Sequence, residues 1–577
     1  MNHVKNQHPL FDVEPFSNLQ EMLTLSSTKH PNKLAVEDLN ETPIPRLTYG
    51  ELYEAVLQFG AALQRMGLKE HEHIALISEN RVQWGVAYLA CVTFNFVVVP
   101  IDKNLKENEI VTILHASNSA AAIFSESYRE MFLEFKHSVK GLRRLIDMDL
   151  KSKNNGLYSM TELMAKSNIR DKKTGFPSTD PDALAILVFT SGSMGRAKGV
   201  MLSQRNISTN LVDMRRMVEI RPEDRFLSVL PMHHTYECTC GLLCPLAAGS
   251  SVHYARSLKT VVDDLQQVRA TILLGVPLLY EKMYRRICKA IDEKKLTAAL
   301  IGPLKTVSGA LETIGLKDIR KILFSEIHKK FGGAIRLFIV GGAAVDPKVA
   351  KGLRSFGFTF VQGYGLTETS PILTLNRLMH FKDEAAGIPL PRVEIRILNP
   401  DDNGRGEILA KGPSVMLGYY KNEKATRDVM ENGWFHTGDI GFIDKDGFLH
   451  INGRKKNVII SGTGENVFPE ELEDRIHAIP FILESVVFGA KNASGNEEVC
   501  VMVVPGAENF IEYAQKHKLE VTRELVEKVI GDEIRALNKT LPAYKQIKRV
   551  RIQDREFEKT TTQKIKRFLI NQEDSIR

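Results

Sequence analysis

The sequence predicts an α/β protein built from more than one domain. In the first half, helical patterns alternate with short apolar runs that have the length and β-branched content of buried strands. The helical patterns cover residues 49–67, 78–93 and 106–117, and the strand-like runs cover 73–77, 96–100 and 120–124. Such alternation is typical of parallel sheets covered by helices. A chain of 577 residues has room for about three or four packed units.

The composition is that of a globular protein and gives no reason to expect a nucleic-acid partner. Charged residues make up 25% of the chain, apolar residues 43%, and the net charge is only +7. This small excess fits anionic small molecules, or weak contact with an anionic membrane, equally well. The amino terminus has no apolar signal core, and six cysteines without a signal indicate a reducing, cytoplasmic setting.

Two features look at first like a membrane span and a metal cluster. The longest apolar stretch, 84–101, is interrupted by Asn95 and closed by Pro100, so we expect a buried helix followed by a strand. Three cysteines follow a histidine pair, in the order His233, His234, Cys238, Cys240 and Cys244. Their spacing lacks the paired C-x-x-C of structural zinc sites and their neighbours are apolar, so packing is the preferred interpretation.

The second half continues the α/β pattern and then changes texture. Strand-like runs occur at 225–230, 251–254, 271–274 and 335–340, and a long basic helical pattern covers 281–330. Beyond Gly387, short strands separated by turn residues predict a small β-rich layer. From about Lys455 the chain has helices and strands of its own. We therefore expect two domains, 1–454 and 455–577.

The loop at 190–199, T-S-G-S-M-G-R-A-K-G, predicts a phosphate-binding site. Gly192 and its neighbouring glycines let backbone N–H groups converge on an anion, while Thr190, Ser191 and Ser193 add hydroxyls and Lys198 adds a charge. The loop is not of the Walker type, because Lys198 is neither preceded by glycine nor followed by a hydroxyl residue. A glycine-rich surface hairpin is the alternative.

Three later motifs carry groups suited to a nucleotide. In V-Q-G-Y-G-L-T-E-T-S-P (361–371), Gly363 and Gly365 flank Tyr364, whose ring offers a face for a base, and Glu368 offers a hard oxygen for Mg²⁺. The alternative is a turn capped by Thr367. In H-T-G-D-I (436–440) and G-R-K-K (453–456), Asp439 suits a ribose diol and Arg454 a phosphate or ribose. Taken singly, these two are a turn aspartate and a surface arginine.

Taken in order, these motifs and the terminal K-T-T-T-Q-K (559–564) resemble the signature set of the AMP-forming adenylating superfamily. That superfamily includes acyl-CoA synthetases, firefly luciferase and peptide-synthetase adenylation domains. The segments L-P-M-H-H-T-Y-E (230–237) and V-G-G-A-A-V-D-P (340–347) look most like those of bacterial long-chain fatty acid CoA ligases.

The resemblance implies a fold and a two-step reaction. The large N-terminal domain would have α/β layers plus a β-barrel-like unit, and a small mobile α+β C-terminal domain would follow a hinge at Lys456. A fatty acid would attack the α-phosphate of Mg-ATP to give acyl-AMP and pyrophosphate, and CoA would then form the thioester. One alternative is a ligase that uses an acyl carrier protein in place of CoA, and another is a degenerate adenylate-binding protein with a regulatory role. The sequence is compatible with a monomer and with a homodimer.

The resemblance also implies roles for individual residues. Lys564 and His234 would act in catalysis, Thr367 and Glu368 would meet the α-phosphate, and Glu368 and Thr190 would hold Mg²⁺. The nucleotide would be bound by Thr190, Ser191, Gly192, Ser193, Lys198, Gly341, Gly342, Ala343, Gly363, Tyr364, Gly365, Asp439 and Arg454. The acyl chain would pass Tyr236, Val276 and Pro277, with the small residues at 341–343 leaving room for it. The chain departs from the family pattern at Glu558 and Gln563 in the tail and at Met194 and Ala197 in the phosphate loop.

Overall fold

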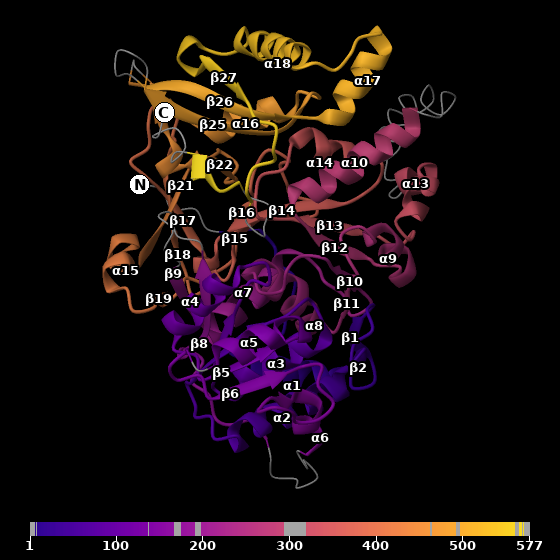
Figure 1. Ribbon diagram of the computed structural model, residues 1–577, viewed down its shortest axis with the longest axis vertical. Coiled ribbons are helices and arrows are strands. Elements are labelled where there is room, and N and C mark those ends of the chain that lie inside the picture. Colours follow the sequence, from indigo (N-terminus) through magenta and orange to yellow (C-terminus); the bar gives the residue numbers. More distant parts are fainter. Residues whose placement is uncertain are drawn as a thin grey trace.

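The computed structural model describes residues 6, 8–136, 138–166, 175–190, 198–292, 319–461, 464–491, 497–559, 565–567 and 569–570. Its architecture is mixed α/β, with a large N-terminal domain and a small C-terminal domain that forms the upper, orange and yellow part of Figure 1. The predicted fold class is therefore confirmed.

The first sheet has eight strands in the order β19-β9-β8-β4-β3-β5-β6-β7. Its parallel part contains β3 (His73–Ile77), β4 (Val97–Pro100), β5 (Ala121–Phe124), β6 (Arg144–Asp147), β7 (Tyr158–Ser159) and β8 (Leu184–Thr190), while β9 (Lys198–Ser203) and β19 (Gly418–Tyr419) run antiparallel at one edge. The predicted helices appear as α2 (Tyr49–Arg65), α3 (Val82–Thr93) and α4 (Glu107–Ser117). Thr48 and Glu51 start α2 with a reciprocal capping box.

The long apolar stretch is a buried helix followed by a strand, as the sequence predicts. All residues of α3 are buried, and the chain then enters the equally buried β4. No helix in the part of the chain that the structure describes is long and apolar enough to cross a membrane.

The second sheet has nine strands in the order β16-β15-β14-β13-β12-β10-β11-β1-β2. Its strands are β1 (Leu34–Asp38), β2 (Arg46–Thr48), β10 (Arg225–Ser228), β11 (Ser251–Tyr254), β12 (Ile272–Gly275), β13 (Leu337–Val340), β14 (Phe360–Gly365), β15 (Ile372–Leu375) and β16 (Ile388–Pro389). The basic helical segment is described as α10 (Pro277–Asp292), α12 (Ile319–Leu323) and α13 (Ser325–Lys330). Residues 293–318 of that prediction lie outside the described residues.

The β-rich layer follows, and then the C-terminal domain. The layer is an antiparallel sheet of β17 (Glu394–Leu398), β18 (Gly406–Lys411), β20 (Met430–Glu431), β21 (Trp434–Ile443) and β22 (Leu449–Arg454). The C-terminal domain has a sheet of β25 (Ile482–Lys491), β26 (Glu497–Pro505) and β27 (Arg549–Ile552), with α16 (Pro469–His477), α17 (Ala507–His517) and α18 (Arg523–Asn538). A separate apolar cluster, which includes Leu472, Val501 and Ile530, fills this domain.

A buried carboxyl group lies in the core behind the second sheet. Glu237 begins the π-helix η2 (Glu237–Leu243), is 1% exposed, and accepts a hydrogen bond of 2.5 Å from Ser228 Oγ at the end of β10. Burial raises the pKa of Glu237 to about 8. Glu237 is therefore a neutral carboxylic acid near pH 7 that ties the helix to the sheet.

This raised pKa predicts that the free energy of unfolding decreases as the pH rises. The stabilising contribution of neutral Glu237 is complete below its ordinary pKa of 4.5 and is lost as the pH rises toward 8. The substitution Glu237→Gln keeps the shape and removes the ionisation, so its stability relative to the parent should improve by about 1.4 kcal/mol per pH unit across this window. Thermal melts of both proteins at several pH values measure this, and a pH-independent difference in Tm contradicts it.

Candidate active site

The predicted phosphate loop lies between the paired strands β8 and β9. β8 and β9 pair antiparallel in register, which places Thr190 directly opposite Lys198, and the Thr190 hydroxyl lies 3.5 Å from the Lys198 carbonyl oxygen. Residues 191–197, including Ser191, Gly192 and Ser193, lie outside the described residues. The structure therefore fixes the two ends of the loop at the edge of the first sheet.

Lys198 and Glu368 are joined through a residue that the sequence does not single out. The ammonium of Lys198 lies 4.6 Å from the centre of the Tyr419 ring, a cation–π distance. The Tyr419 hydroxyl donates to Glu368 Oε1 at 2.9 Å, and the Glu368 carbonyl accepts from Met416 N at 2.8 Å. Burial, and then the Glu368 charge, raise the pKa of Tyr419. A cation and a carboxylate thus contact one buried tyrosine, the first over its ring and the second at its hydroxyl.

A second chain of contacts links Tyr364, Asp439 and Arg454. The Tyr364 hydroxyl donates to Asp439 Oδ2 at 2.6 Å, and Arg454 Nε pairs with Asp439 Oδ1 at 2.7 Å. Asp439 and Arg454 are direct neighbours across β21 and β22, so their ion pair follows from the strand register. Asp439 is 5% exposed, so these contacts hold a nearly buried carboxylate in one orientation.

The two chains of contacts share one electrostatic neighbourhood. Burial and the Asp439 charge raise the pKa of Tyr364, whereas the positive charge of Arg454 lowers it. Arg454 also lowers the pKa of Tyr419. Five of the residues predicted from four separate motifs are therefore brought together: Lys198, Tyr364, Glu368, Asp439 and Arg454.

The glycines around Tyr364 are required by close backbone contacts. A Cβ atom on Gly365 would lie 1.8 Å from the carbonyl oxygen of Pro371, so no other residue fits there. A Cβ atom on Gly363, on the same strand β14, would lie 3.0 Å from the carbonyl oxygen of Thr374. The short helix η3 (Thr367–Thr369) follows and carries Glu368 toward Tyr419.

The structure also brings the proposed acyl-pocket residues together, but the Tyr236 side chain occupies part of the space expected for an acyl chain. A Cβ atom on Gly341 would lie 2.7 Å from the Tyr236 ring, and Gly342, with a φ of +86°, faces Val276. Pro277 starts α10 beside them, and Ala343 is exposed. The space that Gly341 provides is taken by Tyr236, so small residues in the sequence do not by themselves mean an open channel.

His234 lies in the connection between β10 and η2. Its backbone N–H donates to the Pro231 carbonyl at 3.2 Å, and its own carbonyl accepts from Cys238 N at 2.9 Å. Its ring lies against that of His233, with ring centres 4.1 Å apart. Burial raises the pKa of Cys238 to about 12, so this thiol is protonated.

The hinge candidate and the tail lie at opposite ends of the C-terminal domain in sequence. Lys456 is the middle residue of the 3₁₀ helix η4 (Lys455–Asn457), directly after β22. In the tail, Lys559 forms an isolated antiparallel bridge with Ile565 and an ion pair with Glu484 on β25. Lys564 itself lies outside the described residues, so its role stays a prediction.

Tyr419 is the residue that sequence reasoning missed. It reaches Lys198 because β19 pairs with β9, with Tyr419 opposite Val200. A two-residue strand far along the chain gives no periodic signal. The one available hint was the aromatic pair that follows Gly418.

Comparison with known proteins agrees with this geometry. Residues 23–420 match the family model described as AMP-binding enzyme, and residues 456–573 match the one described as AMP-binding enzyme C-terminal domain. The fold is similar to that of the crystal structure of the anthranilate CoA ligase AuaEII in complex with anthranoyl-AMP, with a TM-score of 0.77 at 19% identity, covering 98% of each chain. ATP-bound MatB from Rhodopseudomonas palustris gives a TM-score of 0.76 at 24% identity, covering 96% of this chain and 99% of that one.

Among curated proteins, the chain is 28% identical to the long-chain-fatty-acid–CoA ligase FadD15 of Mycobacterium bovis, covering 83% of this chain and 81% of FadD15. It is also 28% identical to the chloroplastic long-chain-fatty-acid–[acyl-carrier-protein] ligase AEE15 of Arabidopsis thaliana, covering 88% of this chain and 78% of AEE15. The family model spans well over half of the sequence and includes the hairpin, Glu368 and Tyr419. This chain belongs to the family of AMP-binding enzymes.

Proposed function

We propose that this chain is an AMP-forming fatty acid CoA ligase. It activates a medium- to long-chain fatty acid with ATP, releasing pyrophosphate, and transfers the acyl group from acyl-AMP to the thiol of CoA. The observation that carries the proposal is the convergence of Lys198, Glu368 and the Asp439–Arg454 pair around Tyr419 and Tyr364. The names of the relatives support a long-chain fatty acid as the substrate.

In the first step a carboxylate meets a polyphosphate, so positive charge and N–H donors must screen the charge that develops. Lys198 and the hairpin hydroxyls would bind the β- and γ-phosphates, and Thr367 and Glu368 would lie at the α-phosphate. Tyr364 would stack on the adenine while its hydroxyl orients Asp439, which with Arg454 would take the ribose. His234 would contact the fatty acid carboxylate.

The oxygen donors at this site fit Mg²⁺. Glu368 is a half-exposed carboxylate fixed at one oxygen by Tyr419, and Thr190 offers a hydroxyl at the end of β8. Mg²⁺ would neutralise phosphate charge when ATP binds. None of the six cysteines, all of which the structure describes, forms a disulfide, and this supports a reducing, cytoplasmic location.

Release of pyrophosphate tests the proposal directly. The chain is given ATP with acetate, benzoate, octanoate or palmitate, with and without CoA. Octanoate or palmitate should support pyrophosphate release and acyl-CoA formation well above the other acids. If no carboxylate supports ATP–pyrophosphate exchange, the chain is an adenylate-binding protein without this activity.

An acyl carrier protein is a second candidate acceptor. The similarity to AEE15 over most of both chains favours it. Parallel assays with CoA and with a holo acyl carrier protein, at equal thiol concentration, separate the two acceptors.

The tail lysine should matter in one half-reaction only. Lys564→Ala should slow adenylate formation by about 100-fold or more, because this lysine would meet the carboxylate and the α-phosphate in the transition state, while thioester formation from supplied acyl-AMP is spared. Lys566→Ala is the matched control, since Lys566 already pairs with Glu558 at 3.6 Å. Equal losses in both half-reactions contradict the assignment.

Tyr419 should act through Glu368 and Lys198. Tyr419→Phe keeps the ring under Lys198 but removes the 2.9 Å hydrogen bond to Glu368. A hydrogen bond to a charged group contributes about 1.5–3 kcal/mol, so the KM for Mg-ATP should rise about tenfold while the KM for fatty acid stays unchanged. Equal increases in both KM values would mean that Tyr419 supports the fold rather than the nucleotide site.

The hinge should be needed for the second step. We place the domain boundary between residues 454 and 455, so a torsion change at Lys456 would rotate the C-terminal domain as a body. Lys456→Pro fixes φ near −65° and also restricts Lys455, so it should trap one arrangement and impair thioester formation far more than pyrophosphate exchange. Lys456→Ala removes the charge but keeps the rotation, and should leave both half-reactions close to normal. Proportionate loss of both in Lys456→Pro would place the hinge elsewhere.

A further inference from the structure

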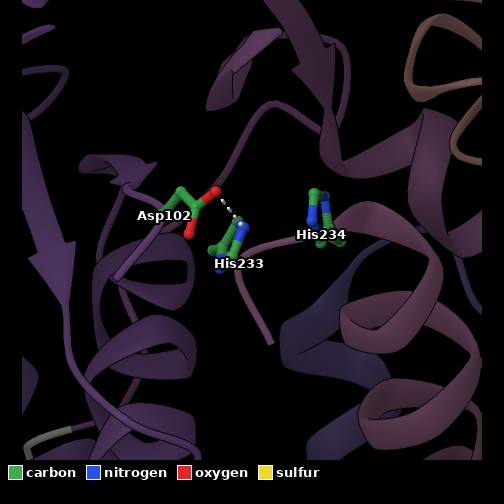
Figure 2. Close-up of side chains that lie close together, drawn as sticks. All are labelled: Asp102, His233 and His234. Carbon is green, nitrogen blue, oxygen red and sulfur yellow. Dashed lines mark ion pairs between the residues drawn. The ribbon is translucent and has the colours of Figure 1, made fainter. Parts of the chain in front are cut away.

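We propose that Asp102, His233 and His234 form a binding site for one divalent transition-metal ion, apart from the Mg²⁺ that accompanies ATP. Figure 2 shows the three side chains side by side: Asp102 comes from the segment after β4, and the two histidines come from the segment after β10. The site thus joins the first sheet to the second. Both segments follow the carboxyl ends of parallel strands, where ligand sites of α/β sheets are usually found.

The distances suit a common ion. One ligand atom from each side chain lies within 4.8 Å of the others, and among the described residues this is the one group of three such side chains. His233 Nε2 and Asp102 Oδ2 are 3.5 Å apart. Two ligands of a tetrahedral ion with bonds of about 2.0–2.1 Å are about 3.3 Å apart, so this pair already has the required separation. His234 has to approach by about 1.5 Å at most, which a side-chain rotation achieves.

The Asp102–His233 pair differs from other histidine–carboxylate pairs of this chain. His253 and Glu37 are 2.8 Å apart, and His450 and Asp444 are 2.9 Å apart, so both pairs are closed into hydrogen bonds. At 3.5 Å the Asp102–His233 pair is too long for one. His436 also has carboxylates at 3.4 and 3.5 Å, but it faces them through its two different ring nitrogens, which cannot converge on one ion.

A buried nitrogen without a hydrogen bond points to the same place. His233 is 8% exposed, and its Nε2 atom makes no hydrogen bond although it faces the Asp102 carboxylate. Leaving a buried polar nitrogen in this state costs about 1–3 kcal/mol. A metal ion between the two groups would satisfy the nitrogen and the carboxylate together.

The backbone that carries the histidines is fixed in advance. Asn80, in the segment after β3, donates from its amide to the Leu230 carbonyl at 2.6 Å and accepts from Met232 N at 3.1 Å. Its amide also lies 3.3 Å from Ser228 Oγ, which holds Glu237. The segment that carries the two histidines therefore has little freedom before a metal arrives, which lowers the entropic cost of binding.

The ligand set indicates the class of metal. Two imidazoles and one carboxylate are the ligands of catalytic zinc sites and of some iron sites, and they leave positions open for water or a substrate oxygen. Mg²⁺ prefers oxygen ligands alone, so the site should discriminate against it.

The consequence for catalysis depends on the proposed function. His234 is the residue that would contact the fatty acid carboxylate, so an ion bound through His234 would compete with that contact. Zn²⁺ should then inhibit the first half-reaction competitively with fatty acid, whereas Mg²⁺ should not.

The site is tested on the full chain with Co²⁺ alone as the probe. One Co²⁺ per chain should bind with the visible absorption bands of a four- or five-coordinate nitrogen and oxygen site, and Zn²⁺ should displace it while excess Mg²⁺ does not. Asp102→Asn and His233→Gln should each weaken binding about tenfold or more. His450→Gln, which alters a closed histidine–carboxylate pair, is the matched control and should bind as the parent does.

Two outcomes would overturn the inference. One is the absence of saturable Co²⁺ binding, or binding that Asp102→Asn and His233→Gln leave unchanged. The other is an intense near-ultraviolet band of thiolate-bound Co²⁺, which would assign the metal to a cysteine. Circular dichroism establishes that each variant is folded, and either variant alone decides the result. Because Co²⁺ absorption is independent of turnover, failure of the proposed ligase activity leaves this test intact.

Discussion

The ion pair between Asp439 and Arg454 connects the nucleotide side of the proposed site with the beginning of the C-terminal domain. Asp439 is nearly buried, and an unpaired charge in such a place is costly, so Arg454 and the Tyr364 hydroxyl have to remain in position. Arg454 is also the last residue of β22, two positions before Lys456. The proposed rotation at Lys456 would therefore start from a fixed residue, and the proposed nucleotide contacts would not have to change during it.

The site forms where residues from three sheets meet. The β8–β9 hairpin comes from the first sheet, Tyr364 from the second and Asp439 from the β-rich layer. Tyr419 lies on β19, which pairs with β9, and connects Lys198 to Glu368. No single layer could hold a triphosphate, a ribose and a base together. This arrangement explains why the chemistry-bearing residues are widely spaced in the sequence while the elements between them are mostly apolar and buried.

The α/β alternation and the motif residues could be predicted because both depend on local signals. Helical and strand periodicity is a property of a few neighbouring residues, and Gly365 or Asp439 belongs to a short motif. Tyr419 could not be found in this way, since its role depends on the pairing of β19 with β9. Gly341 has the same limitation as a sequence signal: a glycine indicates space beside the backbone, but only packing shows that the Tyr236 ring lies in that space. Lys564, Ser191, Gly192 and Ser193 lie outside the described residues and remain predictions.

Two neighbouring residues at the start of η2, Tyr236 and Glu237, differ in how firmly hydrogen bonds hold their side chains. Glu237 is buried and held by Ser228 at 2.5 Å, which anchors the helix. Tyr236, one residue earlier, is only half-buried, and its hydroxyl reaches the carbonyl oxygens of Gly275 and Ile339 at 3.4 and 3.5 Å, at the long limit for a hydrogen bond. In the proposed function, an acyl chain that passes Gly341 would have to displace the Tyr236 ring, which lies against this glycine. Its hydrogen bonds are long and would resist that rotation little, and the anchored Glu237 would hold the start of the helix while the Tyr236 ring moves.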